Sequence, residues 1–147
     1  MKHLSYALPI LAATTLFAAD EKSTSDKEMI QGTWVVVSAE EAGQPRSGDV
    51  GFKAVFTADT LTFQRDKQEP RQMKYKLDST QKPKVIDTTH ETDPGEPILQ
   101  LGVYSLDGDT LKLCLESAGK PRPAKLETKP QDTSILFVLK RAKKQGR

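Results

Sequence analysis

The residues best equipped for metal or acid–base chemistry are His90–Asp93, whose sequence HETD sets one imidazole beside two carboxylates. A zinc site needs three or four ligands that converge on the metal. The only other histidine is His3, at the amino terminus. Pro94-Gly95 follows the group directly and indicates a turn. We therefore expect an exposed loop here and no metal site.

A second acidic group, Asp107–Asp109, reads DGD. It resembles part of a calcium-binding loop, but the spaced acids and the closing glutamate of such a loop are missing. Asp-Gly between two apolar-alternating runs is instead the signal of a tight β-hairpin. The sequence therefore predicts a turn at these residues.

Cys114 is the only cysteine, so no disulfide can form within the chain. A nucleophilic cysteine needs a neighbouring base and a group that orients the base, and nothing places His90 near it. We expect a half-buried structural thiol. No nucleophile elbow, phosphate loop or dinucleotide fingerprint occurs. The spacing of carboxylates such as Asp87 and Glu91 does not favour catalysis, so we expect neither enzyme activity nor a cofactor.

The amino terminus has the pattern of a secretory signal peptide. A short basic start precedes an apolar stretch, Leu4–Phe17, and then the small residues Ala18 and Ala19. The stretch is short for a span of about 20 apolar residues, and Pro9 interrupts it. We expect residues 1–19 to be cleaved, residues 20–28 to form a flexible tether, and the product to be secreted or periplasmic without a membrane span.

The charge of the chain argues against a nucleic-acid partner. The chain has 22 basic and 20 acidic residues, and removal of Lys2 with the leader leaves 21 against 20. Nucleic-acid binding usually needs a concentrated basic face, whereas charges of both signs alternate along this chain. The basic residues at the carboxyl end are expected to form a solvated tail over residues 143–147. We expect a monomer.

From Thr33 onward the chain consists of short runs that alternate apolar and polar residues. This pattern predicts β-strands, and the 3.6-residue period of long helices is missing. The runs are 33–40, 52–57, 60–65, 71–77, 84–89, 98–106, 110–116 and 133–141. Prolines at positions 121, 123 and 130 exclude regular pairing before the last run. Met29–Gln31 is predicted to form a helical turn that plugs one end.

These runs predict an all-β fold, an eight-stranded up-and-down antiparallel barrel over residues 29–142. Closure removes both edges of the sheet. Eight strands enclose an interior that side chains fill or that holds one small ligand. A two-sheet sandwich is the alternative, and it does not require the first and last strands to touch.

The first and last runs carry a pair of residues suited to closing the barrel. If these runs pair antiparallel, Arg141 lies near Trp34, and a guanidinium over an indole contributes about 0.5–2 kcal/mol. Gly32 lets the backbone pass close under the ring. Strict alternation places Trp34, Val36 and Ser38 on one face of the first run. The competing interpretation makes Trp34 an ordinary core aromatic and Arg141 a solvated charge.

Gly32 and Trp34 on the first run, with Arg141 on the last, resemble the signature of lipocalin and calycin barrels. The chain more closely resembles a family of small secreted proteins, common in planctomycetes, described as a lipocalin-like domain of unknown function. The matching segments are 30–34, 36–41, 76–78, 82–84, 86–87, 102–114, 120–123 and 136–141. The resemblance implies a lipocalin-like barrel, and no activity or cofactor, since the family has none assigned.

The remaining candidate site is the barrel interior, where an aromatic-rich face either lines an apolar pocket or close-packs. The candidate ligand-lining residues are Trp34, Val36, Phe52, Phe56, Leu61, Phe63, Met73, Tyr75, Tyr104, Phe137 and Leu139. One hypothesis is a secreted lipocalin-like protein that binds a small apolar or amphipathic molecule. The alternative is a non-enzymatic protein-interaction or envelope-associated module with a packed barrel, whose proline-rich loop, residues 119–130, binds another protein.

Overall fold

The computed structural model describes residues 25–143, and nearly all its regular structure is β-strand. The predicted signal peptide, the first part of the tether and the end of the basic tail lie outside these residues. The elements are α1 (Asp26–Met29), β1 (Gly32–Glu41), β2 (Gln44–Pro45), the 3-10 helix η1 (Ser47–Asp49), β3 (Lys53–Phe56), β4 (Thr60–Gln64), β5 (Arg71–Asp78), β6 (Lys84–His90), β7 (Ile98–Asp107), β8 (Thr110–Leu115) and β9 (Ile135–Arg141).

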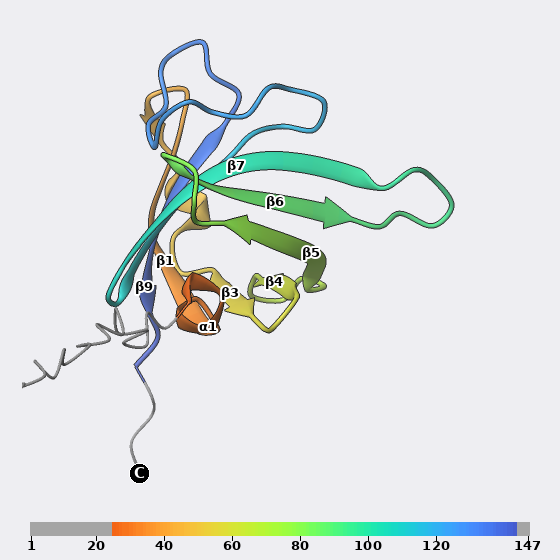
Figure 1. The fold of residues 1–147 in the computed structure, drawn as a ribbon, viewed down its shortest axis with the longest axis vertical. Helices are drawn as coiled ribbons and strands as arrows, with labels where there is room; N and C mark the ends of the chain where they lie inside the picture. Colours follow the sequence, from red (N-terminus) through yellow and green to blue (C-terminus); the bar gives the residue numbers. More distant parts are fainter. Residues whose placement is uncertain (1–24, 144–147) are drawn as a thin grey trace, which may run out of the picture.

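The sheet closes on itself (Figure 1). The strands from β3 to β9 pair antiparallel in chain order, β1 pairs with β3, and β9 returns to pair with β1. The short strand β2 pairs with the end of β1 and stands outside this cycle. The eight-stranded up-and-down barrel predicted from the sequence is therefore confirmed, and the sandwich is excluded.

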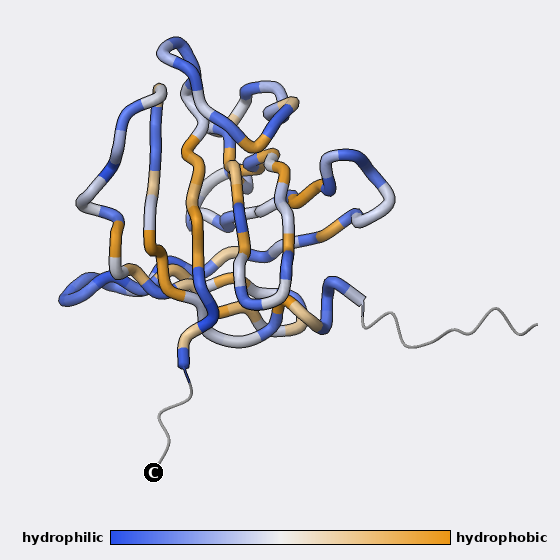
Figure 2. The backbone as a smooth tube through the Cα atoms, turned by 90° about the vertical axis from the view of Figure 1, so that its left-hand side faces the viewer, coloured by the Kyte–Doolittle hydropathy of each residue, from blue (hydrophilic) through white to orange (hydrophobic). Residues whose placement is uncertain are grey.

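The alternation of apolar and polar residues along the strands explains why they form one barrel (Figure 2). In β5, for example, Met73 and Tyr75 are buried while Gln72 and Lys74 are exposed. Inward-facing side chains of this kind recur on every second position of a strand. The predicted DGD hairpin is also confirmed: it joins β7 to β8, and Gly108 at φ 56° supplies the left-handed conformation that the tight turn needs.

A β-bulge in β1 changes which residues face inward. The register with β9 runs from Val36 opposite Leu139 to Ser38 opposite Val138, so Val37 is the extra residue. One extra residue reverses the alternation beyond it. Ala39 is therefore buried and Ser38 is exposed. The prediction that Ser38 continues the face of Trp34 is wrong for this reason.

The strands run between two ends of the barrel that differ in their connections. At the closed end lie α1, the start of β1, the end of β9 and three short links, at residues 57–59, 79–83 and 108–109. At the open end lie the longer links at residues 42–52, 65–70, 91–97 and 116–134. Figure 1 shows α1 and the end of β9 at the bottom and the link between β8 and β9 at the top.

The part of the tether that the structure describes is ordered. The Ser25 hydroxyl accepts a hydrogen bond from the Glu28 amide and caps α1, and the Asp26 carboxylate lies 2.7 Å from Lys84 Nζ. These contacts join α1 to the barrel, so residues 25–28, which the sequence analysis assigned to the tether, pack with the folded domain. The predicted helical turn lies slightly earlier than expected, at Asp26–Met29, and Ile30 directly after it is fully buried.

Candidate binding site at the open end of the barrel

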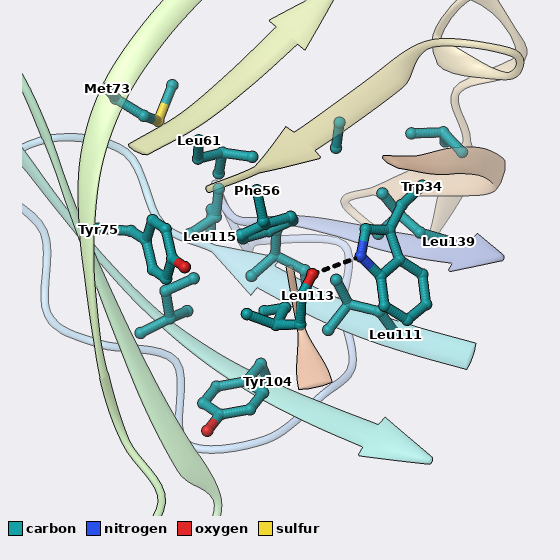
Figure 3. Close-up of a cluster of buried hydrophobic side chains, with 14 of the residues drawn as sticks. Trp34, Phe56, Leu61, Met73, Tyr75, Tyr104, Leu111, Leu113, Leu115 and Leu139 are labelled. Carbon is teal, nitrogen blue, oxygen red and sulfur yellow. Dashed lines mark hydrogen bonds between the residues drawn. The ribbon is translucent and has the colours of Figure 1, made fainter. Parts of the chain in front are cut away.

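The closed end is sealed by the predicted pair. Arg141 pairs with Trp34 in register, and its guanidinium carbon lies 4.3 Å from the centre of the ring. Trp34 has no exposed surface, and its Nε1 donates to the Ile30 carbonyl at 2.7 Å, the dashed line in Figure 3. The closure argument is confirmed, and a solvated Arg141 is excluded.

The guanidinium of Arg141 also holds the end of α1. Its Nη2 donates to the Met29 carbonyl at 2.5 Å and its Nη1 to the Gln31 carbonyl at 2.9 Å. Gly32, at φ 122°, lies so close that an added Cβ would stand 3.0 Å from Arg141 Nη1. The close approach at Gly32 is thus to the guanidinium, whereas the sequence predicts it under the ring.

Above this seal the interior is close-packed rather than hollow. Phe56 meets Tyr75 edge-on, with ring centres 5.2 Å apart at 84°, and the neighbouring leucines fill the space around them (Figure 3). Tyr104 reaches the Asp26 carboxylate with its hydroxyl at 2.8 Å. The packed members include eight of the predicted lining residues: Trp34, Val36, Phe56, Leu61, Met73, Tyr75, Tyr104 and Leu139.

At the open end the side chains leave a cavity of about 330 Å³. Its apolar wall comes from β4, β5, β8, β9 and the residue before β3. That wall contains Phe52, Phe63, Met73, Leu115, Ile135 and Phe137. Four of these, Phe52, Phe63, Met73 and Phe137, are among the predicted lining residues. The sequence-based choice between a packed and an open interior is therefore too coarse, since the packing ends partway along the barrel.

Two aromatic contacts shape the apolar wall. Phe63 and Phe137 have ring centres 5.9 Å apart with planes tilted by 37°. Phe52 lies under the guanidinium of Arg65, whose carbon is 4.5 Å from the ring centre. These rings are only partly buried by the protein, which leaves aromatic surface available to a molecule in the cavity.

A set of cationic side chains that the sequence analysis missed forms one side of the cavity. The rim arginines, as we call them, are Arg46 beside β2, Arg65 just after β4 and Arg71 at the start of β5. Arg46 contacts Asp49 at 2.8 Å, and Arg65 lies 3.7 Å from the same carboxylate. Asp49 is only 5% exposed, so its charge needs these partners.

The opposite side of the cavity is polar. Glu116 is buried, and its Oε1 accepts hydrogen bonds from the Ser117 amide at 2.8 Å and from the Thr133 hydroxyl. Gln100 donates from Nε2 to the Glu116 carbonyl at 3.2 Å. The cavity is therefore amphipathic, with an aromatic wall between a guanidinium side and a hydrogen-bonded polar side.

The other residues considered for chemistry do not converge on a site. His90 ends β6 rather than lying in a loop as predicted, with Nδ1 3.1 Å from the Gln72 carbonyl, because β6 pairs with β7 as far as His90 itself. Asp87 lies 2.6 Å from Arg122 Nη1, and Glu91 lies 3.3 Å from Lys74 Nζ. Within residues 25–143 no three His, Cys, Asp or Glu side chains are grouped as metal ligands would be.

Cys114 is fully buried, not half-buried as predicted. It points to the outer face of β8, where the link at residues 116–134 lies against it, with Sγ 4.0 Å from the Glu127 carbonyl. Burial raises the pKa of the thiol, which keeps it protonated and unreactive. The surrounding link therefore explains Cys114 as a packing residue.

Comparison with protein-family models, with curated proteins and with solved structures found no match. In the part of the chain that the structure describes, no helix has the length and apolar character needed to cross a membrane.

Proposed function

We propose that this chain is a secreted or periplasmic lipocalin-like protein, of the planctomycete-type family that it resembles, and that it binds one small apolar or amphipathic molecule at the open end of its barrel. The observation that supports binding is the cavity itself. The rest of the barrel interior is filled with side chains. The cavity is therefore confined to the open end, where aromatic side chains line it. The alternative, an interaction module with a packed barrel, has less support because the packing stops short of the open end.

The size of the cavity limits the ligand. A volume of about 330 Å³ lies at the low end of the range of about 300–1,000 Å³ for ligand pockets. It corresponds to roughly ten molecules of liquid water. A molecule with one to three aromatic rings, or a medium-length alkyl chain, fits this volume.

A neutral fluorescent probe tests the proposed binding. N-phenyl-1-naphthylamine is uncharged and becomes bright in apolar surroundings. We expect saturable binding of one probe molecule per chain, and we expect Phe137→Ala to weaken it about tenfold because the variant removes one ring of the wall. Leu99→Ala is the matched control, since Leu99 is 49% exposed on β7 and does not line the cavity.

Two results would contradict the proposal. One is the absence of any saturable signal with the wild-type chain. The other is equal weakening by Phe137→Ala and Leu99→Ala, which would place the probe outside the cavity. Native mass spectrometry of protein purified from its own host supplies a second readout, since a bound molecule adds its mass to the chain.

Secretion has its own test. The leader pattern supports cleavage after Ala18 or Ala19. When the full chain is expressed in a bacterium, we expect mass spectrometry of the product outside the cytoplasm to find an amino terminus at Ala19 or Asp20. An intact Met1 in a cytoplasmic product would contradict this part of the proposal.

A further inference from the structure

The polar lining of the cavity narrows the class of ligand beyond an apolar or amphipathic molecule. We infer that the ligand is a small organic carboxylate with an aromatic or alkyl body, and that Arg71 binds its carboxylate while the phenylalanine wall holds the body. The inference rests on the proposed function, because it assigns a chemistry to the ligand of the same cavity.

The sheet places Arg71 at the boundary between the aromatic wall and solvent. In the β4–β5 pair, Arg71 stands directly opposite Phe63. Phe63 in turn lies against Phe137 from β9. Arg71 precedes Met73 by two residues on the same strand, so both belong to the inward-facing row of β5. A ligand body on these rings therefore has its end within reach of the Arg71 guanidinium.

The charges of the cavity show which guanidinium is available. Arg46 is held by two carboxylates, Glu41 at 2.6 Å and Asp49 at 2.8 Å. Arg65 lies over Phe52 and 3.7 Å from Asp49. Arg71, by contrast, has no carboxylate within 4.0 Å among residues 25–143, although it lines the cavity.

The lining carboxylates do not cancel this cation. Asp49 lies between Arg46 and Arg65, and Glu116 accepts two hydrogen bonds on one oxygen on the far side of the cavity. The lining thus holds three guanidinium groups and two carboxylates, and both carboxylates already have partners. The excess positive charge lies on the side of Arg71.

The chemistry of the guanidinium favours a carboxylate over other polar groups. Its planar fork of donors matches the two oxygens of a carboxylate, and the resulting charge-assisted hydrogen bonds are stronger than neutral ones. Aromatic rings on one side lower the local dielectric and strengthen the attraction. A neutral amide of the same shape can form hydrogen bonds with Arg71 but gains no charge–charge attraction.

A matched pair of ligands tests the inference. 2-Naphthoate and 2-naphthamide share their ring system and size and differ in charge. By isothermal titration calorimetry at pH 7 and low salt, we expect the wild-type chain to bind 2-naphthoate about tenfold more tightly, in line with a charge-assisted hydrogen bond. The ratio of the two dissociation constants is the quantity of interest, because it is insensitive to small changes in the apolar wall.

Two variants of β5 test which charge causes the preference for 2-naphthoate over 2-naphthamide. We expect Arg71→Gln to bring the ratio to about one. Lys76→Gln removes the same charge from the exposed face of β5, and we expect it to leave the tenfold ratio unchanged. High salt should reduce the wild-type ratio, since Arg71 is exposed and salt screens the attraction between exposed charges.

The outcomes separate this inference from the proposed function. Equal affinity of the wild-type chain for both ligands would overturn the inference while leaving a binding cavity. A preference that survives Arg71→Gln but disappears in Arg65→Gln would overturn the assignment to Arg71. Failure of both naphthyl ligands and of N-phenyl-1-naphthylamine would overturn the proposed function as well.

Discussion

Each end of the barrel carries an arginine over an aromatic ring, and the two pairs have different roles. At the closed end Arg141 lies 4.3 Å from the Trp34 ring, and at the open end Arg65 lies 4.5 Å from the Phe52 ring. Trp34 is fully buried, whereas Phe52 is partly exposed and lines the cavity. The same type of contact therefore seals one end and borders a cavity at the other.

The two pairs differ in the other groups that each guanidinium contacts. At the closed end, three successive carbonyls at the end of α1 accept hydrogen bonds: those of Met29 and Gln31 from Arg141, and that of Ile30 from Trp34. The carbonyls at the end of a helix lack partners of their own. At the open end the only carboxylate within 4.0 Å of Arg65, among the described residues, is Asp49. Arg141 stabilises the fold because its N–H groups donate to backbone carbonyls, and no such bonds hold Arg65 among the described residues.

The largest expected effect contrasts the two rings. Trp34→Ala should lower the free energy of unfolding by about 3–5 kcal/mol, as for other core aromatics. Phe52→Ala should cost roughly 1–2 kcal/mol, because the ring is only partly buried. Denaturant titration of both variants measures the difference. Equal losses, or a loss below about 1 kcal/mol for Trp34→Ala, would contradict the contrast between a sealed and an open end.

The two arginines give a smaller effect of the same sign. Arg141→Ala removes the contact with the ring and leaves two backbone carbonyls without their donor, so it should cost about 2 kcal/mol. Arg65→Ala should cost less than about 1 kcal/mol, because its ion pair is long, its own side chain is exposed, and Arg46 still pairs with Asp49 in the variant. Both values come from denaturant titration. Wild-type stability of the Arg141 variant would remove the argument that this residue closes the barrel.

Alkaline pH should destabilise the closed end. Burial, and then the hydrogen bond and charge of Asp26, raise the pKa of Tyr104 far above its ordinary value. Above the ordinary tyrosine pKa of about 10, the unfolded chain therefore loses this proton while the folded chain keeps it, and stability falls as pH rises. The slope is at most about 1.4 kcal/mol per pH unit for one such group.

Urea titrations of the wild-type chain and Tyr104→Phe at pH 7 and at pH 10.5 measure this effect. We expect the variant to lose less stability between the two pH values than the wild-type chain. A loss of equal size in both proteins would mean that Tyr104 ionises in the folded state as readily as in the unfolded chain. Tyr75, whose pKa burial also raises, accounts for a remaining slope in the variant.

The smallest effect concerns a buried hydroxyl near the cavity. Thr88 on β6 is fully buried and its hydroxyl has no hydrogen-bond partner among residues 25–143. Its cross-strand neighbours are Tyr75 in the packed interior and Gln100 in the cavity wall. Thr88→Val should change the free energy of unfolding by less than about 1 kcal/mol. We expect a small increase rather than a decrease, because valine buries no hydroxyl without a partner. A loss above about 1 kcal/mol would show that the hydroxyl is satisfied in solution.

Alternation along the chain was sufficient to predict the barrel, because a closed antiparallel sheet imposes a period of two on every strand. The same period placed Trp34 and Arg141 side by side, since both belong to inward-facing rows of paired strands. The bulge at Val37 was not predictable from this pattern. Val35, Val36 and Val37 are identical residues, so the sequence does not show where the alternation shifts. Only the register of β1 with β9 reveals the bulge.

The cavity was predictable in part. The inward-facing row Leu61, Phe63 continues to Arg65, and the row Met73, Tyr75 begins with Arg71, so two neighbouring rows end in arginine at the same end of the barrel. This alignment of two arginines is visible in the sequence and marks the rim of the cavity. Asp49, in contrast, lies in a link whose position depends on tertiary contacts, and propensity does not set the bounds of a four-residue helix such as α1, so the sequence predicts that turn slightly too late in the chain.

The pairing of β1 with β9 brings the start of the first barrel strand beside the end of the last, and Ala142 donates from its amide to the Thr33 carbonyl at 2.8 Å. Both extremities therefore leave the barrel on the side away from the cavity. A circular permutant that joins residue 143 to residue 25 through a flexible linker and opens the chain in the exposed Thr92–Glu96 segment should therefore keep the barrel. Fusion partners or immobilising supports attached at either extremity should leave solvent access to the cavity unobstructed.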